Sequence, residues 1–168
     1  MRQVSPSEAM GKKFPEWIVM VVSRDAEGQP NVMPAGWGMI CSGSPRYVAT
    51  AIGYTRYTYK CIHETGEFVF SWAGEGQEEL VTQTGTSSGS EINKFEEYNI
   101  AWSKPAVIRV PVLDGAAASL ECKLVHEYDA GDHAIFVGEV VAAHLPDEPI
   151  RNIVNFHGDY AVAQPAQE

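Results

Sequence analysis

The sequence predicts a mainly β domain, either a β-barrel or a sandwich with a few short helices, from three observations. Apolar and polar residues alternate over short segments, and residues that favour turns separate these segments. Few stretches have a helical period. Apolar residues make up 45% of the 168 residues and charged residues 20%, a composition typical of globular proteins. No linker or internal repeat divides the chain, so we expect one domain over residues 1–168.

The first two predicted strands form a hairpin. Residues 17–24 (WIVMVVSR) and 31–42 (NVMPAGWGMICS) flank the turn DAEGQP. Gly36 and Gly38 interrupt the second segment, and glycine inside a strand often marks the close approach of a ligand or another chain. Trp37 would then be an aromatic side chain that lines an open binding cleft. A bulged edge strand with a core tryptophan explains the same residues.

Further alternating segments predict the remaining strands. Residues 118–145 give two long strands around the turn DAGD. In the first of them, Leu120 and Cys122 alternate with Glu121 and Lys123, which is typical of a strand with one face in solvent. The other predicted strands are residues 46–52, 67–73 and 106–113.

The segment at residues 56–66 (RYTYKCIHETG) predicts a helix that Thr55 caps and Gly66 ends. The start of a helix presents free N–H groups and the positive end of its dipole, which can bind an anion. Thr55 and Thr58 can add hydroxyl groups and Arg56 a charged fork, so a phosphate is the natural ligand. A capped surface helix with solvated basic side chains explains the same residues.

Two further helices are predicted on either side of a loop of small residues. The first covers residues 77–83 (QEELVTQ), and the loop covers residues 84–90 (TGTSSGS). The second covers residues 91–98 (EINKFEEY), because Ser88 and Glu91 have the spacing of a capping box.

Acidic residues are missing from one long window of the sequence. No Asp or Glu occurs from Gly28 through His63, although the chain has 22 acidic residues. The window holds Arg46, Arg56 and Lys60, so its local charge is +3 in a chain of net charge −10. This pattern indicates a region that tolerates, or requires, an anion.

Composition and motifs argue against several function classes. The pI of about 4.9 argues against nucleic-acid binding, which requires a basic face. The three cysteines and five histidines lack the spacings of a disulfide framework or a metal site. No apolar run has the length of a signal peptide or a membrane span, so we expect no membrane association and a cytoplasmic location. Nucleophile-elbow, Rossmann and P-loop motifs are also missing.

Six fragments, in one specific order, resemble a known family. They are PNVMPAGW, SGSP, YTRYTYKCIHETGEF, TGTSSGSEINKF, LECK and GDHAIFVGEV. From about Trp17 to Val141, the sequence is similar to the flavin reductase-like family, and within it to the flavoredoxin branch. The resemblance implies a split β-barrel of Greek-key type that binds FMN without a covalent bond. It also implies a homodimer with the flavin near the interface, and NADH, NADPH or a redox-partner protein as the electron donor.

The resemblance also implies which residues bind the cofactor. Arg56, Thr58 and the helix start would hold the FMN phosphate with help from Lys94. The cleft around Gly36 and Trp37 would hold the isoalloxazine ring. The predicted cofactor-binding residues are Asn31, Pro34, Ala35, Gly36, Trp37, Gly38, Ala51, Ile52, Gly53, Arg56, Tyr57, Thr58, Lys94 and His133.

No catalytic side chain is predicted, because a flavin carries the hydride chemistry itself. Asn31 and His133 would lie near the ring or the nicotinamide, although His133 could also simply begin a strand. The sequence therefore predicts an NAD(P)H-dependent flavin reductase. The alternative is a flavoredoxin-like electron carrier that does not oxidise nicotinamide. A non-redox binding module and an enzyme similar to pyridoxamine phosphate oxidase are more distant alternatives.

Overall fold

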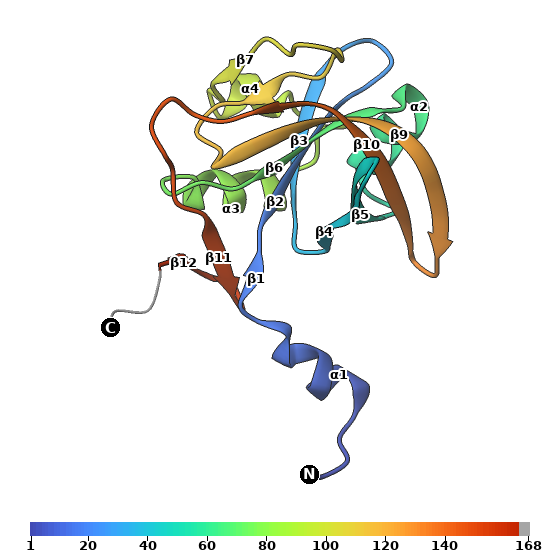
Figure 1. Ribbon diagram of the computed structural model, residues 1–168, viewed down its shortest axis with the longest axis vertical. Coiled ribbons are helices and arrows are strands. Elements are labelled where there is room, and N and C mark those ends of the chain that lie inside the picture. Colours follow the sequence, from blue (N-terminus) through green and yellow to red (C-terminus); the bar gives the residue numbers. More distant parts are fainter. Residues whose placement is uncertain (165–168) are drawn as a thin grey trace.

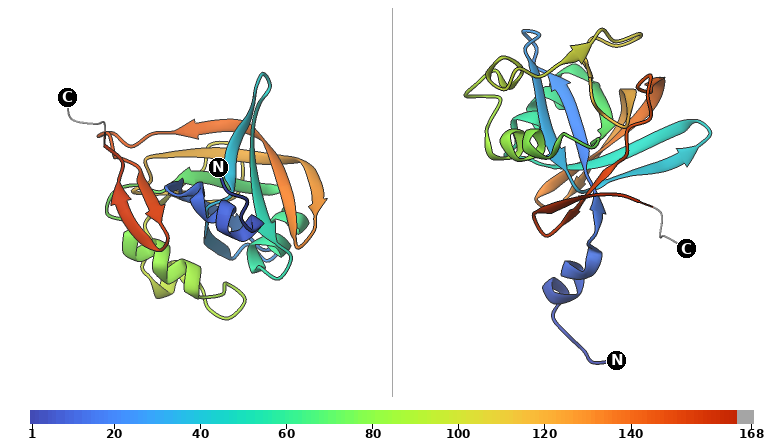
Figure 2. Two further views of the ribbon diagram at one scale, coloured as in Figure 1. Left: turned by 90° about the horizontal axis from the view of Figure 1, so that it is seen from below. Right: turned by 90° about the vertical axis from the view of Figure 1, so that its left-hand side faces the viewer.

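The computed structural model describes residues 1–164 and contains a seven-stranded antiparallel sheet that curls into an open barrel (Figures 1 and 2). Its strands are Val19–Arg24 (β2), Pro30–Ala35 (β3), Gly38–Gly43 (β4), Arg46–Gly53 (β5), Glu67–Trp72 (β6), Ala118–Ala130 (β9) and His133–His144 (β10). They lie in the order β3-β2-β6-β9-β10-β5-β4. Within this order β5 lies beside β10 rather than beside β6, which is a Greek-key arrangement. The predicted mainly β fold is confirmed.

A small second sheet and an N-terminal arm lie below the barrel in Figure 1. The sheet contains Glu16–Trp17 (β1), Ile153–Phe156 (β11) and Asp159–Val162 (β12). The arm contains the helix Pro6–Met10 (α1), which has no buried residue, and the 3₁₀ turn Gly11–Lys13 (η1). Because β1 pairs with β11, the segment that follows the arm is fixed beside the barrel.

Strand β2 contributes to both hydrophobic cores of the molecule. Met20 and Val22 pack into one buried cluster, whereas Val19 and Val21 pack into the other, together with Phe70 of β6. Successive side chains of a strand point to opposite faces, so a strand with buried faces on both sides reads as a continuous apolar run. This explains the uninterrupted apolar segment IVMVV at residues 18–22.

Helix α2 (Tyr57–Thr65) confirms the predicted helix but not its predicted cap. Its N-cap is Arg56, and no hydrogen bond from a side chain caps the helix. Thr55 lies one residue too early to act as the cap. The C-terminal prediction is confirmed, because Gly66 adopts φ 67° and its N–H donates to the carbonyl of Ile62. Glycine is favoured at this left-handed position.

The predicted helix at residues 91–98 is shorter than expected. Helix α4 covers only Lys94–Glu97, and the Asn93 side chain accepts a hydrogen bond from the N–H of Phe95 as its cap. Ser88 instead accepts a hydrogen bond from the N–H of Ser90, so the predicted capping box is wrong. The helix predicted at residues 77–83 is confirmed as Glu78–Thr86 (α3).

The strand predicted at residues 106–113 is wrong over most of its length. Only Val112–Leu113 (β8) is a strand, and it pairs with Trp102–Ser103 (β7). Residues 106–110 form a series of bends instead. The backbone N–H groups of Ala106, Val107 and Ile108 all donate to a single carboxylate, that of Glu121. Three successive N–H groups cannot converge in this way in a strand, where they alternate between opposite sides.

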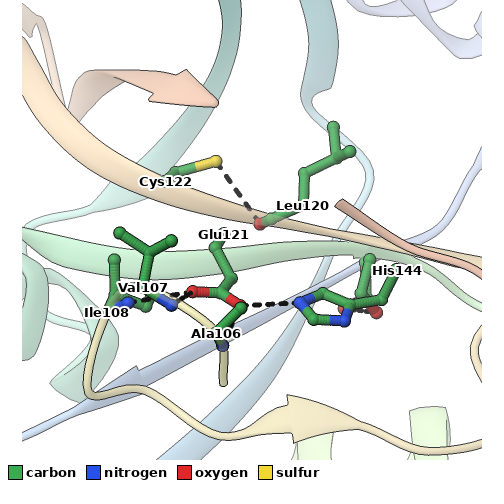
Figure 3. A network of polar contacts seen from close by, with 9 residues as sticks. Ala106, Val107, Ile108, Leu120, Glu121, Cys122 and His144 are labelled. Atoms are coloured by element: carbon green, nitrogen blue, oxygen red, sulfur yellow. Dashed lines mark hydrogen bonds and ion pairs between the residues drawn. The ribbon is translucent and has the colours of Figure 1, made fainter. Parts of the chain in front are cut away.

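Glu121 also contradicts the prediction that alternate residues of its strand face solvent. It is fully buried, and its carboxylate lies between the three N–H groups and His144 of β10, as Figure 3 shows. The donor–acceptor distances are 2.6, 2.8 and 2.9 Å from the N–H groups and 2.6 Å from Nε2 of His144. Burial alone would raise the pKa of Glu121, but these hydrogen bonds hold it below its ordinary value. The glutamate therefore fixes the segment at residues 106–108 onto strand β9.

Candidate functional site

A pocket of about 390 Å³ opens between strand β3, the start of α2 and the C-terminal end of α3. The loop at residues 87–89, the C-terminal part of β5 and the start of β10 also line it, together with single residues of η1, β1 and α4. Twelve of the fourteen predicted residues line it, namely Asn31, Pro34, Ala35, Gly36, Trp37, Ala51, Gly53, Arg56, Tyr57, Thr58, Lys94 and His133. Residues far apart in the sequence thus meet around one cavity, and their role in cofactor binding stays a prediction.

One end of the pocket is formed by the start of α2. The N-cap Arg56 has extended backbone geometry and an exposed side chain, and no capping side chain occupies the first turn. Thr58, in this turn, is buried and lines the pocket. The free N–H groups and the helix dipole favour a negatively charged ligand here, and a guanidinium can add paired hydrogen bonds. This end of the pocket has the donors that a phosphate requires.

Lys94 brings a second cation to the pocket. Its side chain is only 2% exposed, and Nζ donates to the carbonyls of Val32 at 2.9 Å and Thr84 at 2.6 Å. Burial, and then the charge of Arg56, lower the pKa of Lys94 to about 8. An ammonium group has three N–H donors, so one remains after these two hydrogen bonds.

Asn31 has a buried hydrogen-bond acceptor close to the start of α2. Its Nδ2 donates to Oγ1 of Thr58 at 2.9 Å and to Oγ of Ser23 at 3.3 Å. Its Oδ1 has no hydrogen-bond partner among the described residues, although the residue is only 1% exposed. A Cβ atom on Gly89 would lie 2.3 Å from this oxygen, so any residue other than glycine would clash with it at position 89. A buried acceptor without a partner is costly, which indicates that a ligand or water donates to it.

Aromatic side chains also line the pocket. The rings of Trp37 and His133 lie 4.8 Å apart between centroids, tilted by 41°. Nδ1 of His133 is 2.6 Å from a carboxylate oxygen of Asp132, and this hydrogen bond lowers the pKa of the aspartate. Nζ of Lys13 lies 5.6 Å from the Trp37 ring centroid. A flat aromatic ligand could pack against these rings.

The acid-free window of the sequence does not produce an acid-free pocket. Glu16 lines the pocket and forms an ion pair with Lys13, in the segment between the N-terminal arm and the barrel. A Cβ atom on Gly36 would lie 2.5 Å from the carboxyl carbon of Glu16. Gly36 therefore permits close packing of the Glu16 carboxylate, whereas the sequence suggested the close approach of a ligand.

Gly38 and Ile52 are the two predicted residues that do not line the pocket. A Cβ atom on Gly38 would lie 2.8 Å from Cγ2 of Val19 and 3.0 Å from the Phe70 ring, so core packing explains this glycine. The Ile52 side chain is fully buried in the same core. Their sequence neighbours Trp37, Ala51 and Gly53 line the pocket instead, which agrees with the rule that alternate residues of a strand point to opposite faces.

Thr55, whose hydroxyl the sequence suggested as a contact to an anion, also lines the pocket. Eight other lining residues were not predicted, namely Lys13, Glu16, Met33, Thr84, Gly85, Ser87, Ser88 and Gly89. Five of these belong to the small-residue loop TGTSSGS, whose composition could have indicated a backbone that approaches a ligand closely. The contribution of Lys13 and Glu16 depends on the pairing of β1 with β11, which no local signal predicts.

Among the described residues, no cluster of His, Cys, Asp or Glu could hold a metal ion. Over the same residues, no helix has the length and apolar composition needed to cross a membrane.

Comparisons with known proteins point to one family. The family model "Flavin reductase like domain" matches residues 10–164. An uncharacterised protein of Archaeoglobus fulgidus is 39% identical over 113 residues, which are 67% of this chain and 64% of that protein. An NADH-dependent FAD reductase of Streptomyces globisporus is 28% identical over 131 residues, which are 77% of this chain and 70% of that protein.

Solved structures share the fold over the whole chain. An FMN-binding protein from Thermus thermophilus has a TM-score of 0.84 and 27% identity, and the match covers 100% of this chain and 96% of that one. Flavoredoxin of Desulfovibrio vulgaris has a TM-score of 0.81 at 20% identity, with coverage of 100% and 93%, and supports the fold alone. The family model covers most of the chain, so this protein belongs to the flavin reductase-like domain family, as its sequence fragments predicted.

Proposed function

We propose that this chain is an oxidoreductase that holds FMN non-covalently in the pocket and reduces it with NADH or NADPH. The observation that carries the proposal is that cationic groups and aromatic rings line one cavity together. Arg56, Lys94 and the start of α2 supply the cationic groups, and Trp37 and His133 supply the rings. FMN combines the matching parts, a phosphate and a flat ring system.

The residues present fit such a ligand. The volume of about 390 Å³ lies within the usual range of small-molecule sites. The unpaired Oδ1 of Asn31 offers an acceptor to a hydroxyl or ring N–H group of the ligand. A side chain at position 89 would clash with this oxygen, and glycine avoids the clash.

Flavin supplies the hydride chemistry when it is bound, whereas the protein supplies binding and orientation. Arg56 and Lys94 would secure the phosphate, and Trp37 would limit the position of the ring. His133, held by Asp132, would face the nicotinamide. The relative named as an NADH-dependent FAD reductase supports NADH as a donor, and NADPH remains an equal candidate.

We also propose that two copies of the chain form a homodimer, with the flavin near the interface. Strand β4 is an edge of the main sheet, and its Met39 and Ile40 are 59% and 66% exposed. Trp17 lies with them around a groove of about 500 Å³. Exposed apolar side chains on an edge strand favour association.

Light scattering tests the dimer and should give a mass twice the 18.4 kDa of the chain. Ile40→Glu should lower this measured mass toward that of a monomer. A monomeric wild-type protein would refute the dimer.

The phosphate assignment can be tested with Arg56→Ala. A hydrogen bond to a charged group contributes about 1.5–3 kcal/mol, so FMN affinity should fall about ten- to a hundredfold. Riboflavin has the same ring but no phosphate, so its affinity should change little. Arg46→Ala is the matched control, since Arg46 is exposed and does not line the pocket. An equal loss for both flavins would contradict the phosphate role of Arg56.

A further inference from the structure

Lys94 is a buried cation without an acidic partner in the described part of the chain. It is only 2% exposed, and none of the ion pairs among residues 1–164 includes it. Its two hydrogen-bond acceptors are the neutral carbonyls of Val32 on β3 and Thr84 on α3. Burying a charge that is not paired destabilises a protein strongly, so this arrangement indicates that a ligand supplies the missing negative charge.

Of the two lysines that line the pocket, Lys94 alone has no carboxylate partner among the described residues, since Lys13 pairs with Glu16. The charge that acts on Lys94 comes from Arg56 at the start of α2, which favours the neutral amine. Tyr57 also lines the pocket, but burial and its hydrogen bond to Asp25 raise the pKa of the phenol far above neutrality. His133 lines the pocket too, and its Nδ1 is 2.6 Å from a carboxylate oxygen of Asp132.

We infer that Lys94 couples ligand binding to proton uptake, so that the pocket prefers a phosphomonoester dianion and loses this preference as the pH rises above neutrality. This inference rests on the proposed function, in which the ligand is FMN. With both carbonyls satisfied, a protonated Lys94 has one N–H left to donate to a phosphate oxygen. A neutral Lys94 would present its lone pair instead, which repels that oxygen.

The size of the effect follows from the protonated fraction. With a pKa of about 8, Lys94 is mostly charged at pH 7 and about one-tenth charged at pH 9. If only the charged form holds the phosphate, FMN affinity should fall about tenfold between these two values. The second phosphate ionisation lies near pH 6, so the charge of FMN changes little over this range. Riboflavin, which has no phosphate, should keep its affinity.

The test is to titrate the wild-type protein with FMN and with riboflavin at pH 7, 8 and 9. Calorimetry at pH 8.5 in two buffers of different ionisation enthalpy measures the number of protons taken up. We expect proton uptake of more than half a proton with FMN and close to none with riboflavin. Lys94→Met should abolish both the uptake and the tenfold change, whereas Lys104→Met, at an exposed lysine, should preserve them.

The outcomes separate the inference from the function on which it rests. Tight FMN binding with no proton uptake, or with the same pH dependence for riboflavin, would overturn the role of Lys94 and leave the proposed function intact. No FMN binding at pH 7 would refute both. If Lys94→Met does not fold, the proton uptake of the wild-type protein still decides the question.

Discussion

Replacing Glu121 with glutamine should destabilise the protein far more than a surface substitution of the same kind. The carboxylate accepts hydrogen bonds from Ala106, Val107 and Ile108 and contacts His144, all while fully buried. Glutamine keeps one acceptor oxygen but places an amide NH₂ group where the other carboxylate oxygen was. At least one buried N–H then lacks its partner, and the remaining hydrogen bonds lose the help of a negative charge.

The magnitude can be estimated from these contacts. An unsatisfied buried donor costs about 1–3 kcal/mol, and the change from charged to neutral acceptor adds up to about 1 kcal/mol for each remaining bond. We therefore expect the free energy of unfolding to fall by about 3 kcal/mol at pH 7. For a domain of this size, that lowers the melting temperature by about 6–12 °C. The control is Glu148→Gln at an exposed position, where the change should stay within about 0.5 kcal/mol.

Urea unfolding at several pH values adds a second check on Glu121. Its pKa is lower in the folded protein than in the unfolded chain, so its contribution to stability is complete above the unfolded pKa. As the pH falls through the folded pKa, this contribution is lost. The stability difference between the wild type and Glu121→Gln should therefore shrink in acid. A difference below 1 kcal/mol at pH 7, or one that does not change with pH, would refute this explanation.

Two further substitutions test the aromatic lining of the pocket and the barrel core. Trp37→Ala should weaken FMN and riboflavin alike by about tenfold, because both contain the ring, and an effect on FMN alone in fluorescence titrations would contradict the assignment. Gly138→Ala should lower the free energy of unfolding by about 1–3 kcal/mol, because its Cβ would lie 2.5 Å from Cζ of Phe68. Gly43→Ala, where nothing lies within 4 Å, is the control, and equal effects in urea unfolding would refute the packing argument.

Strands β2, β5, β6, β9 and β10 could be predicted from the sequence because each depends on a local pattern. The single strand predicted at residues 31–42 is divided in the structure into β3 and β4. The hairpin β2–β3 has a turn of Asp, Gly and Pro between two apolar segments, and the turn of β9–β10 has Gly131 at φ 73°. Such turns and alternations are set by neighbouring residues, so one sequence is enough to find them.

The segment at residues 106–113 could not be predicted, since its structure depends on a residue from another strand. Its apolar alternation is typical of a strand, but the carboxylate of Glu121 holds its N–H groups in a different arrangement. The sequence also predicts the wrong environment for Glu121 itself, because a charged residue between apolar ones in a strand normally faces solvent. The carboxylate of Glu121 can be buried because three backbone N–H groups and His144 surround it as hydrogen-bond partners.

The lining of the pocket was predicted best where its residues belong to short sequence fragments. Asn31, Trp37, Arg56 and Thr58 come from fragments that resemble one family, and all four line the pocket. Glu16 could not be found in this way, because the β1–β11 pairing that brings its segment to the pocket joins the two ends of the chain.

The most direct test of the proposed function is a visible absorption spectrum. The protein is incubated with FMN, freed of unbound flavin by gel filtration, and recorded under argon before and after addition of NADH, NADPH and then dithionite. We predict a bound-flavin spectrum that bleaches with at least one of the two nucleotides. A spectrum that bleaches only with dithionite would replace the reductase with an electron carrier, as in the flavoredoxin alternative. A protein that retains no flavin would contradict the central claim.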